Sequence, residues 1–216
     1  MVQVKICGIN TPEALDAVAA GGADFVGFNF YPPSPRFVTA AQAGVLIARA
    51  PNTLRKVGLF VDPDDATLEH TLATAKLDML QVQGHETAAR VAAIRARFGL
   101  PVMKAIKVAF AADLDAASSF AAVADWFLFD GAPPKDKKGA LPGGNAARFD
   151  WTLLKGRRFA KPWMLAGGLD PGNVAEAIRV AGPPCVDVSS GVETHPGRKD
   201  PAKILAFIRA ARGATG

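Results

Sequence analysis

Three side chains in this sequence stand where they could do chemistry. Cys7 ends a short apolar segment and is followed at once by a glycine, so its thiol could face a cavity and serve as a base or a nucleophile. Asp130 ends a second apolar segment, which is typical of a catalytic acid or of a loop cap. Arg36 follows a proline-rich loop, and its planar guanidinium suits a carboxylate or a phosphate.

Two further segments could bind an anion through their backbone. Both consist of small residues, whose N–H groups can surround a phosphate without obstruction by side chains. Taken singly, the glycine pair could be a turn and the second serine a helix cap. Together they favour a phosphate site. The residues concerned are Gly167 and Gly168 in one segment and Ser189, Ser190 and Gly191 in the other.

The residue pattern predicts the elements that must position these groups. Strand-like segments alternate with helix-like segments at a nearly even pitch, and the strands are apolar without a clean polar face, as in parallel sheets covered by helices. The predicted strands are 2–7, 24–30, 56–61, 79–82, 102–108, 126–130, 163–166 and 186–189. Helices are expected at 11–20, 39–48, around 68–75 and 91–98, at 111–123, briefly near 150, and at 171–180 and 201–211.

Eight such units predict an α/β fold, a single (β/α)8 TIM barrel that occupies residues 1–216 as one domain. A doubly wound open sheet is the competing fold. It is disfavoured because no Gly-x-Gly-x-x-Gly follows the first strand and no phosphate-loop lysine motif occurs. In a TIM barrel the active site lies at the carboxyl ends of the strands, which is where the candidate residues stand.

Composition narrows the class of protein. The chain carries a formal charge of +5, which suits a small anionic substrate, and its basic residues lack the aromatic platform of a nucleic-acid site. No apolar run reaches the roughly 18 residues of a membrane span, so we expect a cytoplasmic protein without a membrane partner. Two cysteines do not indicate a disulfide framework. His70, His85 and His195 lack ligand spacing, so no metal site is expected.

Each candidate also has a plain structural interpretation. Arg36, taken alone, would more often be a surface arginine. Cys185 is expected to be a small buried hydrophobe, which is the usual role of a free cysteine. Asp187 lies between two valines within a strand, where it could be a buried, hydrogen-bonded structural carboxylate, and it is left out of the catalytic set. The loop 131–148 is long and polar, as expected of a functional lid or a disordered insertion.

The sequence closely resembles the phosphoribosylanthranilate isomerase family of tryptophan biosynthesis. The likeness spans nearly the whole chain in the right order, and its proline loop and Ser-Ser-Gly-Val-Glu segment are the most specific parts. The matching segments are Lys5–Gly8, Gly27–Arg36, Val57–Val61, Gln81–Glu86, Phe149–Trp151, Leu165–Leu169, Asn173–Val174, Asp187–Glu193, Gly197 and Lys199–Asp200.

The resemblance implies an Amadori rearrangement of N-(5-phosphoribosyl)anthranilate to 1-(2-carboxyphenylamino)-1-deoxyribulose 5-phosphate, without cofactor or metal. It implies that Asp130 protonates the furanose ring oxygen and that Cys7 removes the C2 proton. Arg36 would hold the anthranilate carboxylate, and the glycine and serine segments would hold the phosphate. The enzyme is expected to act as a monomer or a homodimer.

Two positions depart from the family pattern. Gln83 replaces the histidine of the usual Gln-Leu-His-Gly, so we expect hydrogen bonding to substrate there and no titration. Ala146 replaces a glycine in the long loop, which makes a positive φ harder to reach. The alternatives are another phosphosugar aldose-ketose isomerase, such as that of the histidine pathway, which is expected to have an aspartate in place of Cys7, and a non-catalytic anion-binding barrel.

Overall fold

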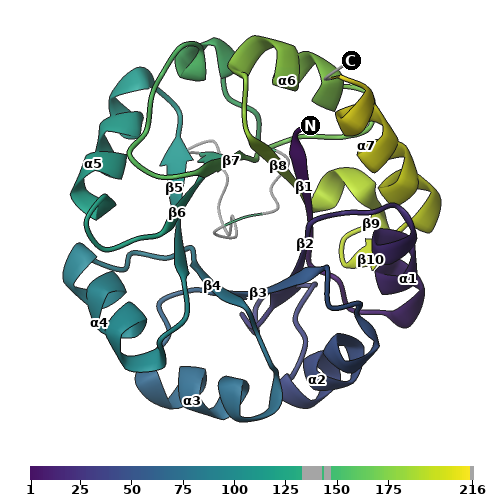
Figure 1. Cartoon of the computed structure of the whole chain (residues 1–216), viewed down its shortest axis with the longest axis vertical. Coiled ribbons are helices and arrows are strands. Elements are labelled where there is room, and N and C mark those ends of the chain that lie inside the picture. Colours follow the sequence, from purple (N-terminus) through teal and green to yellow (C-terminus); the bar gives the residue numbers. More distant parts are fainter. Residues whose placement is uncertain (133–142, 144–146, 215–216) are drawn as a thin grey trace.

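In the computed structural model, which describes residues 1–132, 143 and 147–214, eight parallel strands close into a barrel (Figure 1). They follow one another in chain order, and β1 pairs with β8 to complete the ring. This is the (β/α)8 fold that the strand pattern predicts. The strands are β1 (Gln3–Cys7), β2 (Phe25–Asn29), β3 (Arg55–Phe60), β4 (Met79–Val82), β5 (Val102–Val108), β6 (Trp126–Gly131), β7 (Trp163–Leu165) and β8 (Cys185–Val188).

Helices lie around the outside of the barrel (Figure 1), and several begin at a side-chain cap. Thr11, Thr39, Asp64 and Thr87 each accept a hydrogen bond from a backbone N–H in the first turn of the following helix. The helices are α1 (Pro12–Ala20), α2 (Ala40–Arg49), α3 (Asp65–Thr74), α4 (Ala88–Phe98), α5 (Ala116–Phe120), α6 (Val174–Ala181) and α7 (Pro201–Gly213).

Three connections differ in local detail from the simple alternation of strands and helices. The helix expected at 111–123 is divided into the 3-10 turn η1 (Ala111–Asp115) and the short α5, and Asp113 caps the start of the segment by accepting hydrogen bonds from the backbone N–H groups of Ala109 and Phe110. The short helix expected near 150 is present, as the 3-10 turn η2 (Trp151–Leu154) in the connection between β6 and β7. A small antiparallel hairpin, β9 (Glu193–His195) and β10 (Arg198–Lys199), stands between β8 and α7, and the sequence pattern did not predict it.

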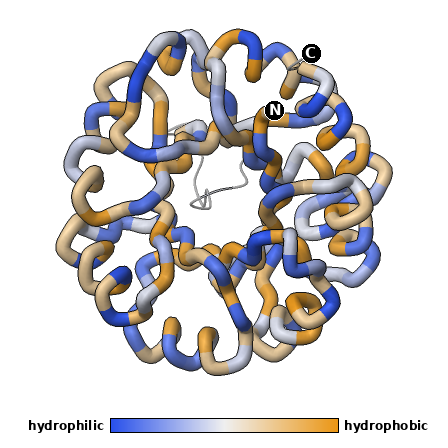
Figure 2. Tube along the Cα trace, viewed as in Figure 1, coloured by the Kyte–Doolittle hydropathy of each residue, from blue (hydrophilic) through white to orange (hydrophobic). Residues whose placement is uncertain are grey.

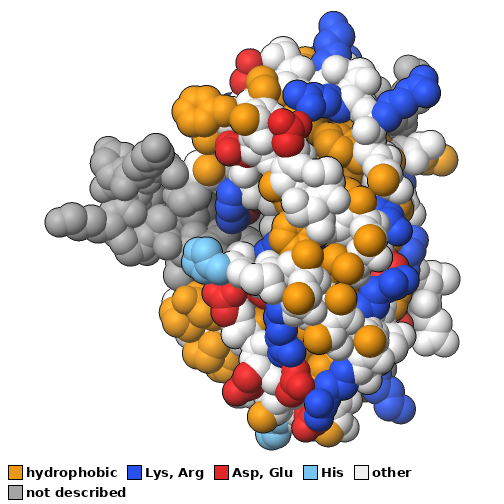
Figure 3. Space-filling view, turned by 90° about the vertical axis from the view of Figure 1, so that its left-hand side faces the viewer, with side chains coloured by type: hydrophobic (Ala, Val, Ile, Leu, Met, Phe, Trp, Pro, Cys, Tyr) orange, Lys and Arg blue, Asp and Glu red, His pale blue; other side chains and the backbone are white. Residues whose placement is uncertain are grey.

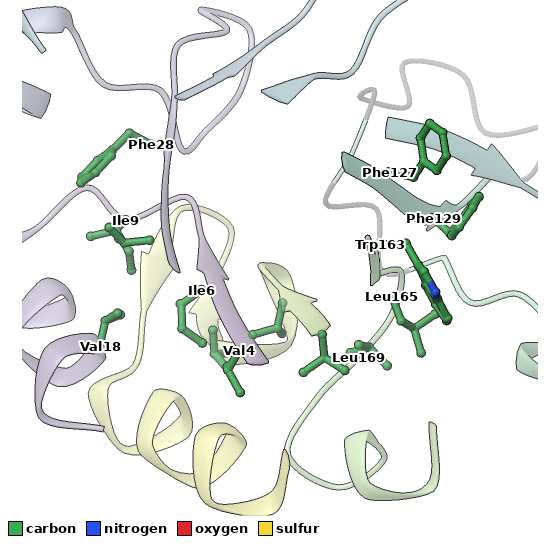
Figure 4. Close-up of a cluster of buried hydrophobic side chains, with 14 of the residues drawn as sticks. Val4, Ile6, Ile9, Val18, Phe28, Phe127, Phe129, Trp163, Leu165 and Leu169 are labelled. Carbon is green, nitrogen blue, oxygen red and sulfur yellow. The ribbon is translucent and has the colours of Figure 1, made fainter. Parts of the chain in front are cut away.

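Alternate residues along the strands face opposite sides of the barrel wall, as the pleat requires. Val4 and Ile6 of β1 lie in the large cluster between strands and helices, where Figure 4 also shows Phe127, Phe129 and Trp163. Residues of the other parity fill the barrel interior, namely Phe25, Val57, Met79, Met103, Ala105, Leu128, Met164, Ala166 and Cys185. Figure 2 accordingly shows apolar positions along both the strands and the helices.

The outer surface is mixed in charge. Figure 3 shows lysine and arginine side chains among acidic ones on the face it presents. Among the described residues, no helix is both long and apolar enough to cross a membrane.

Candidate active site

The candidate residues meet in one cavity at the carboxyl ends of the strands. Cys7 and Asp130, from β1 and β6, both line this cavity, as do Arg36 and Gln83. The end of β7 and the end of β8 complete it. The remaining lining residues are Asn29, Tyr31, Ser34, Leu59, Val61, Gln81, Leu128, Gly143, Ala166, Gly167, Gly168, Leu169, Asp187, Val188, Ser189 and Ser190. Gly191 follows directly, in the 3-10 turn η3 (Ser190–Val192).

The Cys7 thiol rests against the neighbouring strand. Cys7 is in register with Gly27 of β2, and a methyl group at Gly27 would lie 2.8 Å from Sγ and 3.1 Å from the Cys7 Cα. The glycine therefore provides the space that the thiol occupies. Burial raises the pKa of Cys7, while the ammonium groups of Lys5 and Lys199 act in the opposite direction.

Lys5 and Asp187 form a buried ion pair directly below the thiol. Lys5 is fully buried, and its Nζ donates a hydrogen bond of 2.9 Å to Asp187 Oδ1 on β8. Burial raises the pKa of Asp187 and would lower that of Lys5, but the charges of Asp187 and Cys7 outweigh burial and raise the pKa of Lys5. Asp187 is thus the buried, hydrogen-bonded carboxylate expected from the sequence, and it also lines the cavity.

Asp130 is paired with a lysine from the adjacent strand. Lys107 of β5 is in register with Asp130 and donates a short hydrogen bond from Nζ to Oδ2. Leu128 and Asp130 share the inward face of β6, so the strand pleat directs the carboxyl group toward the cavity. Cys7 and Asp130 therefore face one cavity from different sectors of the barrel wall.

Arg36 is not a surface arginine. Its side chain is buried and crosses Gly8, whose φ of +78° and missing Cβ allow this approach, since a methyl group there would lie 2.8 Å from Arg36 Cδ. Nε and Nη2 donate to Glu193 of β9 at 2.7 and 2.8 Å. Among the described residues no partner binds Nη1. Lys199 of β10 donates to the same Glu193 at 2.8 Å.

The two small-residue segments lie against each other at the cavity rim. A methyl group at Gly191 would lie 1.9 Å from the carbonyl oxygen of Leu169, so the segments are in van der Waals contact. Gly167 and Gly168 have φ values of +89° and +63°, which glycine adopts readily. The backbone N–H groups of Gly168 and Ser190 donate to no other described residue, as an anion-binding turn requires.

Ser189 has a different role from its neighbour Ser190. Its hydroxyl donates to the carbonyl oxygen of Cys7 at 3.1 Å and also accepts from Lys199 at 3.1 Å. The side chain of Ser189 therefore ties β8 to β1.

Two glutamines line the side of the cavity formed by β4. Gln81 Nε2 donates to Gln83 Oε1 at 2.8 Å, and a methyl group at Gly143 would lie 1.9 Å from Gln83 Nε2. Gln83 is held by its neighbours and lies next to the long loop. Most of that loop, including Ala146, lies outside the described residues, so its expected lid role stays a prediction.

Sequence reasoning missed four charged residues of this site: Lys5, Lys107, Glu193 and Lys199. Parity was a signal for two of them, because Lys5 shares the inward face with Cys7 and Lys107 lies two residues beyond the inward-facing Ala105. Lys5, Glu193 and Lys199 also lie in the segments that match the family, but no role was assigned to them. Among the described residues no group of His, Cys, Asp and Glu could hold a metal ion. His70, His85 and His195 are exposed.

Comparison with known proteins agrees with this geometry. The family model described as N-(5'phosphoribosyl)anthranilate (PRA) isomerase matches residues 4–210. The isomerase of that name from Paramagnetospirillum magneticum is 59% identical over 212 residues, covering 98% of both chains. That from Rhodospirillum centenum is 56% identical over 210 residues, covering 97% of this chain and 98% of the relative.

The chain belongs to the phosphoribosylanthranilate isomerase family.

The isomerase also resembles solved members of the family. The crystal structure of the enzyme from Thermotoga maritima has a TM-score of 0.87 and 35% identity, covering 99% of this chain and 100% of that one. Another solved isomerase, with a TM-score of 0.85 and 34% identity, covers 99% of this chain and 100% of its own, and holds reduced 1-(o-carboxyphenylamino)-1-deoxyribulose 5-phosphate. The protein is an aldose-ketose isomerase of tryptophan biosynthesis that acts on phosphoribosylanthranilate.

Proposed function

We propose that Cys7 and Asp130 carry out the rearrangement as general base and general acid. The observation that carries this proposal is that both groups line one cavity, on β1 and β6, and can reach one sugar from different directions. Asp130 gives its proton to the furanose ring oxygen. The bond from C1 to that oxygen breaks, and the nitrogen lone pair forms the protonated Schiff base.

In the second step the Cys7 thiolate takes the proton from C2. The electron pair of the C2–H bond forms the C1–C2 double bond of an enolamine, and the iminium nitrogen regains its lone pair. Tautomerisation adds a proton to C1 and removes one from the C2 hydroxyl, which gives the ketose. The rearrangement needs no external oxidant or reductant, so acid and base groups of the protein suffice.

Two anchors hold the substrate across the cavity. Arg36 holds the anthranilate carboxylate through Nη1, because Nε and Nη2 are committed to Glu193. Gly167, Gly168, Ser190 and Gly191 hold the phosphate through backbone N–H groups at the ends of β7 and β8, the position at which barrels of this class commonly bind phosphate. Such positioning lowers the entropic cost of reaction.

The remaining roles are narrower. Gln83 contributes a hydrogen bond near the reacting sugar, and Ser189 acts by holding Cys7. The chain forms one (β/α)8 domain over 1–216, acts in the cytoplasm, and works as a monomer or a homodimer. A solved relative is described as monomers made from the dimeric isomerase of Thermotoga maritima, which supports considering both states.

The acid and base roles are tested by following the loss of phosphoribosylanthranilate fluorescence. Cys7→Ser and Asp130→Asn should each lower kcat by about 100-fold or more and change KM little, because general acid–base groups contribute about 10²–10⁴. Asp125→Asn is the matched control. Asp125 lies directly before the amino end of β6, the end away from the cavity, and pairs with Arg95. Near wild-type kcat in both site variants would remove the assignment.

A further inference from the structure

Lys5 is the fully buried charge that the rearrangement leaves unused. Its side chain occupies the barrel interior between the apolar cluster below and the cavity above, and its Nζ donates a hydrogen bond of 2.9 Å to Asp187. Burying an ammonium group is expensive even when it is paired, and such a pair is weak evidence for added stability. An apolar side chain of similar volume would fill this space at less cost.

The location of Lys5 relative to Cys7 suggests what the charge does. The two residues are two positions apart on β1, so their side chains project from the same face of the strand. Asp187 of β8 is in register with Lys5, which places its carboxylate beside the ammonium group. Gly27, which contacts the thiol, lies on the other side of β1, in β2. The result is a cluster of one thiol, one ammonium and one carboxylate across two adjacent strands.

We propose that Lys5 is a positioning residue whose buried ammonium is the counter-ion of the Cys7 thiolate, with Asp187 holding that ammonium in place. This inference rests on the proposed role of Cys7 as the base. A thiolate is required for proton abstraction, and in a cavity that already holds two carboxyl groups it needs an adjacent positive charge. Lys5 supplies that charge without itself touching the substrate.

All charged groups around Cys7 enter this balance. From β1, Lys5 lowers the pKa of Cys7 by its charge and by a hydrogen bond. From β8, Asp187 raises it, and from β10, Lys199 lowers it. Arg36 crosses the adjacent Gly8, and Asp130 of β6 acts on Asp187. Lys199 is shared with Glu193 and Ser189, so Lys5 is the cation whose loss should affect the thiol most.

Removing either member of the Lys5–Asp187 ion pair should change the pH midpoint for alkylation of Cys7, and the two changes should have opposite signs. Lys5→Met removes the cation and should move the pH midpoint for alkylation of Cys7 by iodoacetamide upward by about one unit, which is a tenfold loss of thiolate at fixed pH. The value of kcat should fall by a similar factor near pH 7 and recover at higher pH, with KM little changed. Asp187→Asn removes the anion and should move the same midpoint downward.

The controls separate this effect from a general loss of structure. Lys56→Met removes another buried lysine, paired with Asp78 at 3.7 Å on β3, and should leave the midpoint where it is. Cys7→Ser reports any reaction at Cys185, which is subtracted. An ion pair with only a structural role would give variants that lose stability together and leave the midpoint unchanged, and that result overturns the inference.

The same experiments distinguish a failure of the role proposed for Lys5 from a failure of the role proposed for Cys7. If Cys7→Ser retains turnover, Cys7 is not the base, although the alkylation midpoints can still shift. If Cys7→Ser abolishes turnover and Lys5→Met shifts nothing, only the role of Lys5 is refuted. Should Lys5→Met not fold, Asp187→Asn decides alone, and an unchanged or upward midpoint in that variant counts against the proposal.

Discussion

Glu193 holds two of the three guanidinium nitrogens of Arg36, at 2.7 and 2.8 Å, and both side chains are buried. The geometry is a two-point, charge-assisted pair that fixes the plane of the guanidinium group. Residues 157 positions apart in sequence are thereby joined at the cavity wall. The direction in which Arg36 presents Nη1 depends on this carboxylate.

The first prediction concerns substrate affinity. Arg36→Ala removes the carboxylate anchor and should raise KM by about tenfold or more, in line with a charged hydrogen bond of roughly 1.5–3 kcal/mol, with a smaller change in kcat. Glu193→Gln keeps Arg36 but loosens its orientation, so KM should rise by a smaller factor. Steady-state fluorescence kinetics measure both. An unchanged KM in Arg36→Ala would exclude Arg36 from the substrate site.

The second prediction concerns stability in acid. Burial alone would raise the pKa of Glu193, but the hydrogen bonds and charges of Arg36 and Lys199 outweigh it and lower the pKa. A carboxyl group with a depressed pKa in the folded state stabilises the protein above its unfolded pKa of about 4.3, and this contribution is lost as pH falls further. Urea unfolding should therefore show a smaller loss of stability below that pH in Glu193→Gln than in the wild type.

The third prediction tests the space that the thiol occupies. Gly27→Ala adds a methyl group 2.8 Å from Cys7 Sγ, so the thiol must move away from its position against β2. We expect a loss of about 1–3 kcal/mol in the free energy of unfolding and a lower kcat. Gly213→Ala is the matched control because no other group lies within 4 Å of its added methyl. Wild-type turnover in Gly27→Ala would show that the thiol position is not critical.

The fourth prediction tests the phosphate segments. Gly191→Ala places a methyl group 1.9 Å from the Leu169 carbonyl oxygen and must push the β7 and β8 segments apart. Inhibition by inorganic phosphate should weaken together with substrate binding, while inhibition by anthranilate should stay the same. Equal weakening for both inhibitors would indicate a general distortion of the cavity and contradict a separate phosphate site.

The sequence predicted the architecture well because the signals that determine it are local. Alternation of apolar strands with capped helices identified the barrel, and the rule that strands end at the active site identified Cys7 and Asp130 as facing one cavity. Gln83, Gly168 and Ser190 also line that cavity. Their roles toward substrate remain predictions that the experiments above would test.

Long-range pairing was beyond local reasoning. Nothing in the neighbourhood of Arg36 indicates Glu193, and nothing near Lys5 indicates Asp187, which is 182 positions away. The hairpin β9–β10 was missed because strands of three and two residues carry too short a pattern to recognise. These pairings arise from closure of the ring, which no window of a few residues can reveal.

Closure of the barrel through pairing of β1 with β8 has a consequence during synthesis of the polypeptide on the ribosome. Cys7, Lys5 and Arg36 emerge from the ribosome well before their partners Asp187, Glu193 and Lys199. A nascent chain that ends at β7 holds the thiol and the guanidinium group but none of the carboxylates that orient the cations around them. Activity should therefore appear only after β8 and the hairpin β9–β10 have been synthesised, so catalysis itself reports that β1 and β8 have met.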